Sequence, residues 1–323
     1  GGGGGGGGGP GAPAPPAPAP RNGAPPPRRE TTTPKKSHHD PPPRWEDCPV
    51  ADFGVLGVPR DHPPADANGY LRAAIAWHFG EATGSPFWLR AAKTLDFDPL
   101  TEVHTFADLR RFPNLVDELR DIPVEDLIPR GYGSPPPVPR VFESGGTTGV
   151  PKRTAQLPDW VEQVTRWQVD DFALGGFVAG QGLLCLMPTG PHGVGYFDEV
   201  IAERLGSICY PIDLDPRWVK KLTARRASAE VSAYVDHVVD QARAILTSQR
   251  VSNLHTTPPL LEAIARDDTL VALVNAKVRW ILLSGAHVDL DTFDLFREIF
   301  DATITTVFGS TMILSQATTR TAG

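Results

Sequence analysis

From residue 140 onward, the sequence alternates short apolar runs with longer amphipathic segments, and this alternation restricts the fold more than any other feature. The apolar runs have the length of buried strands. The segments between them carry helix signals, such as Pro158 in the first turn of one and Gly206 just after another. Repeated strand–helix alternation predicts an α/β fold, with a mainly parallel sheet flanked by helices.

The expected elements follow from these patterns. Strands are expected at residues 183–187, 207–212, 251–255, 278–283 and 302–308. Helices are expected at 158–172, 196–205, 258–265 and 291–300, with one or two more within 216–246. Asp289 or Asp291 is expected to cap the helix at 291–300. The residues after Phe308 are expected to contain no complete element.

The first part of the chain has a different composition. More than half of residues 1–43 are Gly or Pro, so this segment is expected to be a disordered tail. Residues 44–140 are expected to form a mostly helical N-terminal part of the core domain. Their clearest helix is 67–79, with Leu71 and Ile75 on one face. The α/β region then spans 141–323.

Charge and hydropathy exclude several classes of protein. The formal net charge is −7, and residues 46–323 alone carry 25 basic and 36 acidic side chains. Such an acidic body argues against nucleic-acid binding. No apolar run approaches the roughly 20 residues of a membrane helix, and the N-terminus has no signal-peptide pattern. A soluble, cytoplasmic protein without membrane or nucleic-acid partners is expected.

The three cysteines, Cys48, Cys185 and Cys209, are far apart and form no CxxC motif. This spacing suggests neither a zinc site nor a disulfide framework. Cys185 and Cys209 lie in apolar runs and are expected to be buried thiols.

A glycine-rich segment at residues 143–152 carries the strongest chemical signal. Its glycines allow a tight turn and a close approach of the backbone to a ligand, while its hydroxyls and one lysine can bind an anion of triphosphate size. The spacing is not that of the common P-loop, and GxGxxG does not occur. The expected binding residues are Ser144, Gly145, Gly146, Thr147, Thr148, Gly149 and Lys152.

This segment resembles the Ser/Thr/Gly-rich loop of the adenylate-forming superfamily, which comprises acyl-CoA synthetases, nonribosomal peptide adenylation domains and firefly-type luciferases. Glu143 and Gly146 depart from the family pattern, where Thr and Ser or Thr are usual. The residues that carry the likeness are Ser144, Gly145, Thr147, Thr148, Gly149, Pro151 and Lys152.

Three later segments resemble further motifs of the same family, in the family's order. The resemblance implies that His192, within residues 188–195, lies beside the acyl substrate. It places Gly285 and Ala286, within 283–287, along the adenine. In 306–311 it places Phe308 near adenine and Thr311 at the α-phosphate. The implied catalytic residues are Lys152, His192 and Thr311, and the remaining nucleotide contacts are Gly285, Ala286, Phe308, Gly309 and Ser310.

The resemblance implies ATP-dependent activation of a carboxylic acid as an acyl-adenylate, followed by transfer to CoA, a carrier protein, an amine or another protein. The family also uses Mg²⁺, but Met312 stands where its usual Glu would bind the metal, and no metal ligand is identified. The likeness covers about residues 140–315, so 141–323 resembles an AMP-binding region without the family's C-terminal lobe. The chain is also similar to a bacterial subgroup associated with phenazine antibiotic biosynthesis.

Two alternatives stay open at this point. In the first alternative, the chain is a catalytically incomplete nucleotide-binding fragment or degenerate relative, because Met312 and the missing lobe remove parts of the family's site. Alternatively, it is a proline-rich interaction protein whose tail, with PxxP-like spacing within residues 14–20, is the functional part.

Overall fold

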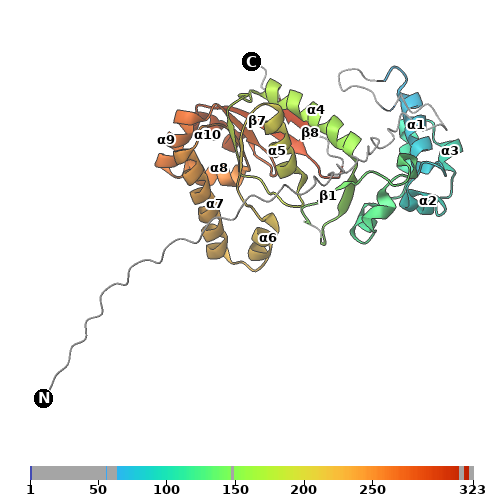
Figure 1. Ribbon diagram of the computed structural model, residues 1–323, viewed down its shortest axis with the longest axis horizontal. Coiled ribbons are helices and arrows are strands. Elements are labelled where there is room, and N and C mark those ends of the chain that lie inside the picture. Colours follow the sequence, from blue (N-terminus) through green and yellow to red (C-terminus); the bar gives the residue numbers. More distant parts are fainter. Residues whose placement is uncertain (2–55, 57–63, 147–148, 313–315, 320–323) are drawn as a thin grey trace, which may run out of the picture. The chain divides into compact units, whose positions relative to one another are not determined.

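The computed structural model describes residues 1, 56, 64–146, 149–312 and 316–319. Within these residues, six strands form the larger of two sheets (Figure 1), in the order β4-β3-β5-β6-β7-β8. The first five are parallel, and β8 pairs with β7 in the antiparallel sense. The strands are β3 Gly182–Cys185, β4 Cys209–Pro211, β5 Val251–Thr256, β6 Trp280–Leu283, β7 Thr303–Gly309 and β8 Gln316–Thr319.

The central strands β3 and β6 carry no polar side chains other than a cysteine because both faces of the sheet are covered. All four residues of β3 and all four of β6 are buried. Helices α4 and α5 cover one face, where they pack on Leu183, Trp280 and Leu282. Helices α7 to α10 cover the other face (Figure 1). The bounds are α4 Pro158–Gly175, α5 Gly193–Arg204, α6 Pro216–Ala224, α7 Ser228–Ser248, α8 Pro258–Ala265, α9 Asp268–Lys277 and α10 Leu290–Ile299.

Local sequence signals set the ends of these helices. Proline occupies the first turn of α4, α6 and α8, where its missing N–H costs no hydrogen bond. Aspartate carboxylates cap α6, α9 and α10 by accepting backbone N–H groups of the first turn, and they are Asp215, Asp267 and Asp289. Gly176, in the left-handed region, ends α4.

The α/β fold with a mainly parallel sheet is therefore confirmed, and segment 216–246 contains two helices. Two expectations are wrong. A complete strand, β8, does follow Phe308. Its four residues, one alanine and three polar, show no hydrophobic pattern, and main-chain pairing along β7 forms the strand. Cys209 is only partly buried, because β4 is an edge strand. Helix α9 was not expected.

The segment before the sheet is built from short helices. Its α-helices are α1 Ala67–Phe79, α2 Pro86–Ala92 and α3 Pro99–Glu102. Its 3₁₀ helices are η3 Phe106–Arg111, η4 Val116–Arg120, η5 Val124–Leu127 and η6 Arg130–Tyr132. A separate small core lies between α1 and the residues that flank α3, and it is made of Leu71, Ile75, Phe79, Phe97 and Val103. The expected tail at 1–43 lies outside the described residues, apart from Gly1.

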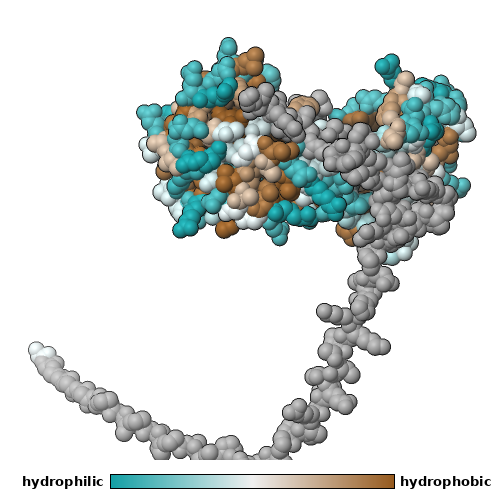
Figure 2. Space-filling model, turned by 90° about the horizontal axis from the view of Figure 1, so that it is seen from above, coloured by the Kyte–Doolittle hydropathy of each residue, from teal (hydrophilic) through white to brown (hydrophobic). Residues whose placement is uncertain are grey.

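Apolar and polar side chains are interspersed on the surface. On the face in view in Figure 2, apolar residues stand in small groups among polar ones. Single exposed apolar side chains such as Leu290 and Leu174 are ordinary for a folded protein. In the described part of the chain, no helix combines the length and apolarity needed to cross a bilayer.

Candidate functional site

The glycine-rich segment connects two short antiparallel strands, β1 Arg140–Glu143 and β2 Arg153–Gln156. Two hydrogen bonds close the segment: Ser144 N–H donates to the Lys152 carbonyl, and Lys152 N–H donates to Ser144 Oγ, both at 2.9 Å. Gly146 and Gly149 have φ of 64° and 136°, a conformation that favours glycine. Thr147 and Thr148, both expected to bind phosphate, lie outside the described residues.

Glu143 fixes the base of this segment to helix α6. Its carboxylate accepts from Arg153 Nε at 3.0 Å and from Arg217 Nη2 at 2.6 Å, and Arg217 belongs to α6. Burial acts to raise the pKa of Glu143, but the hydrogen bond and charge of Arg217, followed by those of Arg153, outweigh it. The pKa is therefore lowered, and the carboxylate is charged at neutral pH. Glu143 therefore joins the hairpin to α6.

Replacing Glu143 by glutamine is expected to reduce the free energy of unfolding at pH 7 by about 2 kcal/mol, because two hydrogen bonds to charged groups lose their ionic partner. The lowered pKa sets the pH dependence. The stabilisation is fully present above the ordinary glutamate pKa of 4.5 and is lost as pH falls through the lower pKa of the folded protein. Urea unfolding of both proteins between pH 3 and 8 measures the difference.

Glu162 provides the matched control for this variant. It also accepts from two arginines, Arg204 and Arg166, but its side chain is 37% exposed against 16% for Glu143. Glu162→Gln is expected to cost about 0–1 kcal/mol, as exposed ion pairs do. Equal costs for the two variants would contradict the anchoring role of Glu143.

A cavity of about 350 Å³ lies at the carboxyl ends of the central parallel strands. Its wall contains residues just after β3, β5 and β6, among them Met187, Thr257 and Ser284. The chain passes from β3 to β4 through α5 on one face, and returns to β5 through α7 on the other. Strands β3 and β5 therefore flank a topological switch point, where open α/β sheets bind their ligands.

Six of the predicted site residues line this cavity, and they come from four separate segments of the chain. All of the predicted site residues belong to these four segments. The six are Gly145, His192, Gly285, Gly309, Ser310 and Thr311.

Other predicted residues lie outside the cavity lining. The ammonium of Lys152 pairs with Asp117 of η4, 3.1 Å away, and Arg120 contacts the same carboxylate at 2.9 Å. Phe308 is largely exposed to solvent. The remaining predicted residues that do not line the cavity are Ser144, Gly146, Gly149 and Ala286.

His192 precedes the first turn of α5 and is half-buried. The segment before it is bonded to the hairpin, because Glu143 N–H donates to the Pro191 carbonyl at 2.8 Å. Burial, and then the charge of Arg217, lower the pKa of His192, although Asp215 and Glu143 oppose the shift. The neutral imidazole is therefore favoured at neutral pH, so His192 offers a hydrogen-bonding ring to a ligand.

Lys220 is a cavity residue that sequence reasoning missed. It belongs to α6, and its Nζ donates to the Gly145 carbonyl at 2.6 Å. This contact brings a cation to the glycine-rich segment from a distant helix. Residues 216–224 contain no motif, so only the tertiary contact reveals this lysine.

A buried polar trio in the cavity wall was also missed. Ser284 Oγ lies 2.7 Å from His255 Nε2, and His255 Nδ1 lies 2.8 Å and 2.9 Å from the two carboxylate oxygens of Asp198. Cys185 Sγ donates to the same carboxylate at 2.9 Å. One signal was present in the sequence: His255 is an ionisable residue in a strand whose other residues are all non-ionisable.

No protein ligand for Mg²⁺ is identified among the residues with described positions. Among the residues with described positions, no group of three or more His, Cys, Asp or Glu is arranged to hold a metal. Met312 offers a thioether, whereas Mg²⁺ prefers oxygen ligands. Asp198 is the carboxylate in the cavity lining, and His255 and Cys185 already occupy it.

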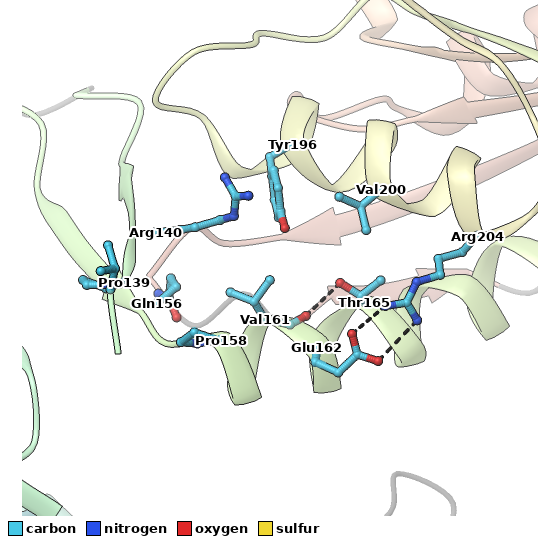
Figure 3. Close-up of a pocket in the computed structure, with 11 residues that line it drawn as sticks. Pro139, Arg140, Gln156, Pro158, Val161, Glu162, Thr165, Tyr196, Val200 and Arg204 are labelled. Atoms are coloured by element: carbon cyan, nitrogen blue, oxygen red, sulfur yellow. Dashed lines mark hydrogen bonds and ion pairs between the residues drawn. The ribbon is translucent and has the colours of Figure 1, made fainter. Parts of the chain in front are cut away.

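A second cavity, of about 520 Å³, lies between β1, α4 and α5 (Figure 3). Its charged groups already have partners: the Arg140 guanidinium carbon lies 3.9 Å from the Tyr196 ring centre, and Arg204 pairs with Glu162 at 2.6 Å. None of the predicted site residues lines it. The cavity at the switch point is therefore the candidate site.

No family model matches the chain, and no curated protein matches it. Several solved structures resemble parts of it. ATP-bound MatB from Rhodopseudomonas palustris is 13% identical over 57% of this chain and 31% of its own, with a TM-score of 0.39. A 2-hydroxyisobutyryl-CoA ligase in complex with 2-HIB-AMP and CoA is 16% identical over 77% and 54%, with a TM-score of 0.47.

The N-terminal domain of FACL13 from Mycobacterium tuberculosis is 15% identical over 52% of this chain and 35% of its own, with a TM-score of 0.36. The chain thus spans between 31% and 54% of the length of these three structures.

Proposed function

We propose that this chain is part of an adenylate-forming ligase that binds ATP in the cavity at the switch point and activates a carboxylic acid as its acyl-adenylate. One observation carries the proposal. Four segments that resemble the superfamily's motifs, far apart in the sequence, contribute Gly145, His192, Gly285 and Thr311 to one cavity. The cavity also lies where open parallel sheets bind nucleotides.

The proposed roles follow from the kind of group each residue offers. The glycine-rich segment and the Lys220 ammonium would hold the β- and γ-phosphates, and Thr311 would meet the α-phosphate. Lys152 would join them on release from Asp117. His192 would face the acyl substrate. The adenine would lie against the segment formed by Gly285 and Ala286, and against Phe308, Gly309 and Ser310.

In the proposed reaction, a carboxylate oxygen of the acid attacks the α-phosphorus of ATP. A new P–O bond forms to the acid, and the bond to the leaving pyrophosphate breaks. Negative charge builds on the phosphate oxygens, so cations and N–H or O–H donors fixed in advance lower the barrier. Lys220 and Thr311 both line the cavity, and they can supply such a charge and such a donor.

The acyl group would then pass to the thiol of CoA or of a carrier protein, or to an amine or another protein. The resemblance to the phenazine-associated subgroup extends the proposal to secondary metabolite biosynthesis in the cytoplasm. A screen of aromatic and aliphatic acids for acyl-adenylate formation would identify the substrate class.

Lys220→Ala is expected to weaken ATP binding about tenfold, because one charge-assisted hydrogen bond to phosphate is lost. Isothermal titration calorimetry measures the dissociation constants. Lys221→Ala is the matched control, since it removes the same charge from an exposed neighbour on α6 outside the cavity lining. Unchanged binding in Lys220→Ala, or equal weakening in both variants, would refute the phosphate role, and no binding at millimolar ATP would refute the nucleotide site.

A second candidate function is nucleotide binding without efficient adenylation. Met312 in place of the metal-binding glutamate, and the lack of a metal-binding group among the residues described, favour this alternative. Acid-dependent exchange of pyrophosphate into ATP separates the two functions. Exchange supports the ligase, whereas ATP binding with no exchange for any acid supports the binding protein.

A further inference from the structure

We propose that Ser284 is a nucleophile that accepts an acyl group from a carboxylic ester, with His255 as its general base and Asp198 as the residue that orients the histidine. The reaction needs no nucleotide, so it does not depend on the ATP site proposed above. It would make the same cavity a site of acyl transfer to the protein itself.

The geometry is that of a serine–histidine–carboxylate relay. The distance from Ser284 Oγ to His255 Nε2 is 2.7 Å, and the distances from His255 Nδ1 to the Asp198 carboxylate oxygens are 2.8 Å and 2.9 Å. All are within the range in which a base takes a serine proton and a carboxylate holds the base. Such a relay is identified by its geometry and not by the order of its residues in the chain.

The contact with Asp198 sets which ring nitrogen of His255 carries the proton. The Asp198 carboxylate accepts, so His255 Nδ1 carries the proton that it donates, and Nε2 is left as an acceptor for the Ser284 hydroxyl. Cys185 does not compete for this role. Its hydrogen bond with Cys209, its burial and the charge of Asp198 raise the pKa of the Cys185 thiol, so it stays protonated and donates to Asp198.

Ser284 is also placed to meet a substrate. It follows β6 directly and lines the cavity, whereas Asp198 and His255 lie deeper, with 1% and 2% of their surfaces exposed against 8% for Ser284. Gly285, the next residue, lines the cavity too, and its N–H has no hydrogen-bond partner among the residues whose positions are described. In serine hydrolases, the N–H after the nucleophile stabilises the negative oxygen that forms during acyl transfer.

The step balances with groups that are present. Ser284 Oγ forms a bond to the carbonyl carbon of the ester while its proton moves to His255 Nε2. The bond from that carbon to the ester oxygen breaks, and the leaving alcohol takes the proton from His255. Water then attacks the acyl-serine and gives a proton to His255. The bond from the acyl carbon to Ser284 Oγ breaks, and Oγ takes that proton from His255, which leaves the acid and the free serine.

The test uses p-nitrophenyl acetate as the ester, without ATP. We expect a burst of p-nitrophenolate and an acetyl group on the peptide that contains Ser284, detected by mass spectrometry. Ser284→Ala should lose the burst. His255→Gln should slow acetylation about 100-fold, the usual contribution of a general base.

Ser207→Ala is the matched control, because Ser207 is as buried as Ser284, at 8% exposure, but lies outside the cavity lining. It should keep the full burst. Absence of acetyl on Ser284 in the unmodified protein would overturn the proposal, as would an unchanged burst in Ser284→Ala. The first result needs no variant, so misfolding of a mutant cannot mask it. Calorimetry with ATP on the same samples reports separately on the nucleotide site.

Discussion

Replacing Trp280 by alanine is expected to reduce the free energy of unfolding by about 3–5 kcal/mol, the usual cost of deleting a large aromatic side chain from a core. Trp280 lies on β6 with 1% of its surface exposed. Its ring centre is 5.2 Å from that of Phe172 on α4 and 5.4 Å from that of Phe177. The indole N–H donates to Thr305 Oγ1 at 3.2 Å, which ties β6 to β7.

Urea denaturation followed by circular dichroism measures this effect. Trp218→Ala is the control, since Trp218 is 41% exposed, and it should cost less than about 1 kcal/mol. Trp280→Phe keeps most of the volume and loses the hydrogen bond, so its cost should be intermediate. A Trp280→Ala protein as stable as Trp218→Ala would show that this side of the sheet does not depend on the aromatic cluster.

The second large effect is expected at Asn253, which is fully buried on β5. Its Nδ2 donates to the carbonyls of Val178, Gln181 and Gly182, and its Oδ1 accepts from Val178 N–H at 2.8 Å. Asn253→Asp keeps the shape but puts an oxygen against three carbonyls. An uncompensated buried charge costs about 3–5 kcal/mol, so a loss of that size is expected at pH 7.

The pH dependence of this variant has a definite sign. Burial and the facing carbonyls disfavour the ionised carboxylate, so the pKa of the introduced aspartate is raised in the folded state. The charge penalty is therefore absent below the unfolded pKa of about 3.9 and grows as pH rises toward the folded pKa.

Unfolding at pH 4 and pH 7, each relative to the unmodified protein, tests this sign. Asn114→Asp, the same change at an exposed position, should shift stability by no more than about 0.5 kcal/mol at either pH. A loss at Asn253 that is independent of pH would show that the missing donor, and not the charge, sets the cost.

The sheet could be predicted because its signals are local. Strands such as β6 are continuous apolar runs, and helix ends carry their own proline, aspartate or glycine. Strand β8 could not be predicted in the same way. Three of its four residues are polar, and four residues are too few to show a period, so pairing with β7 explains their extended conformation.

Part of the cavity was predictable, since the motifs that contain His192, Gly285 and Thr311 follow predicted strands, whose carboxyl ends meet at one edge. Lys220 and the trio of Ser284, His255 and Asp198 could not be predicted. Asp198 comes from α5, His255 from β5 and Ser284 from the turn after β6, and no spacing in the chain relates them. The sheet order, which places β5 beside both β3 and β6, brings them together.

Because several parts of the sheet build the cavity wall, ligand binding in the cavity requires the whole sheet to be folded. Its wall needs the hairpin loop at Gly145, the start of α5, and the turns after β5, β6 and β7, so no piece shorter than residues 145–311 contains the whole wall. A compound that fills it binds only the assembled state. Such a compound therefore opposes unfolding everywhere in the sheet, by about 2.7 kcal/mol at a hundred times its dissociation constant. In this protein, a ligand that binds the cavity more tightly therefore also raises the free energy of unfolding further.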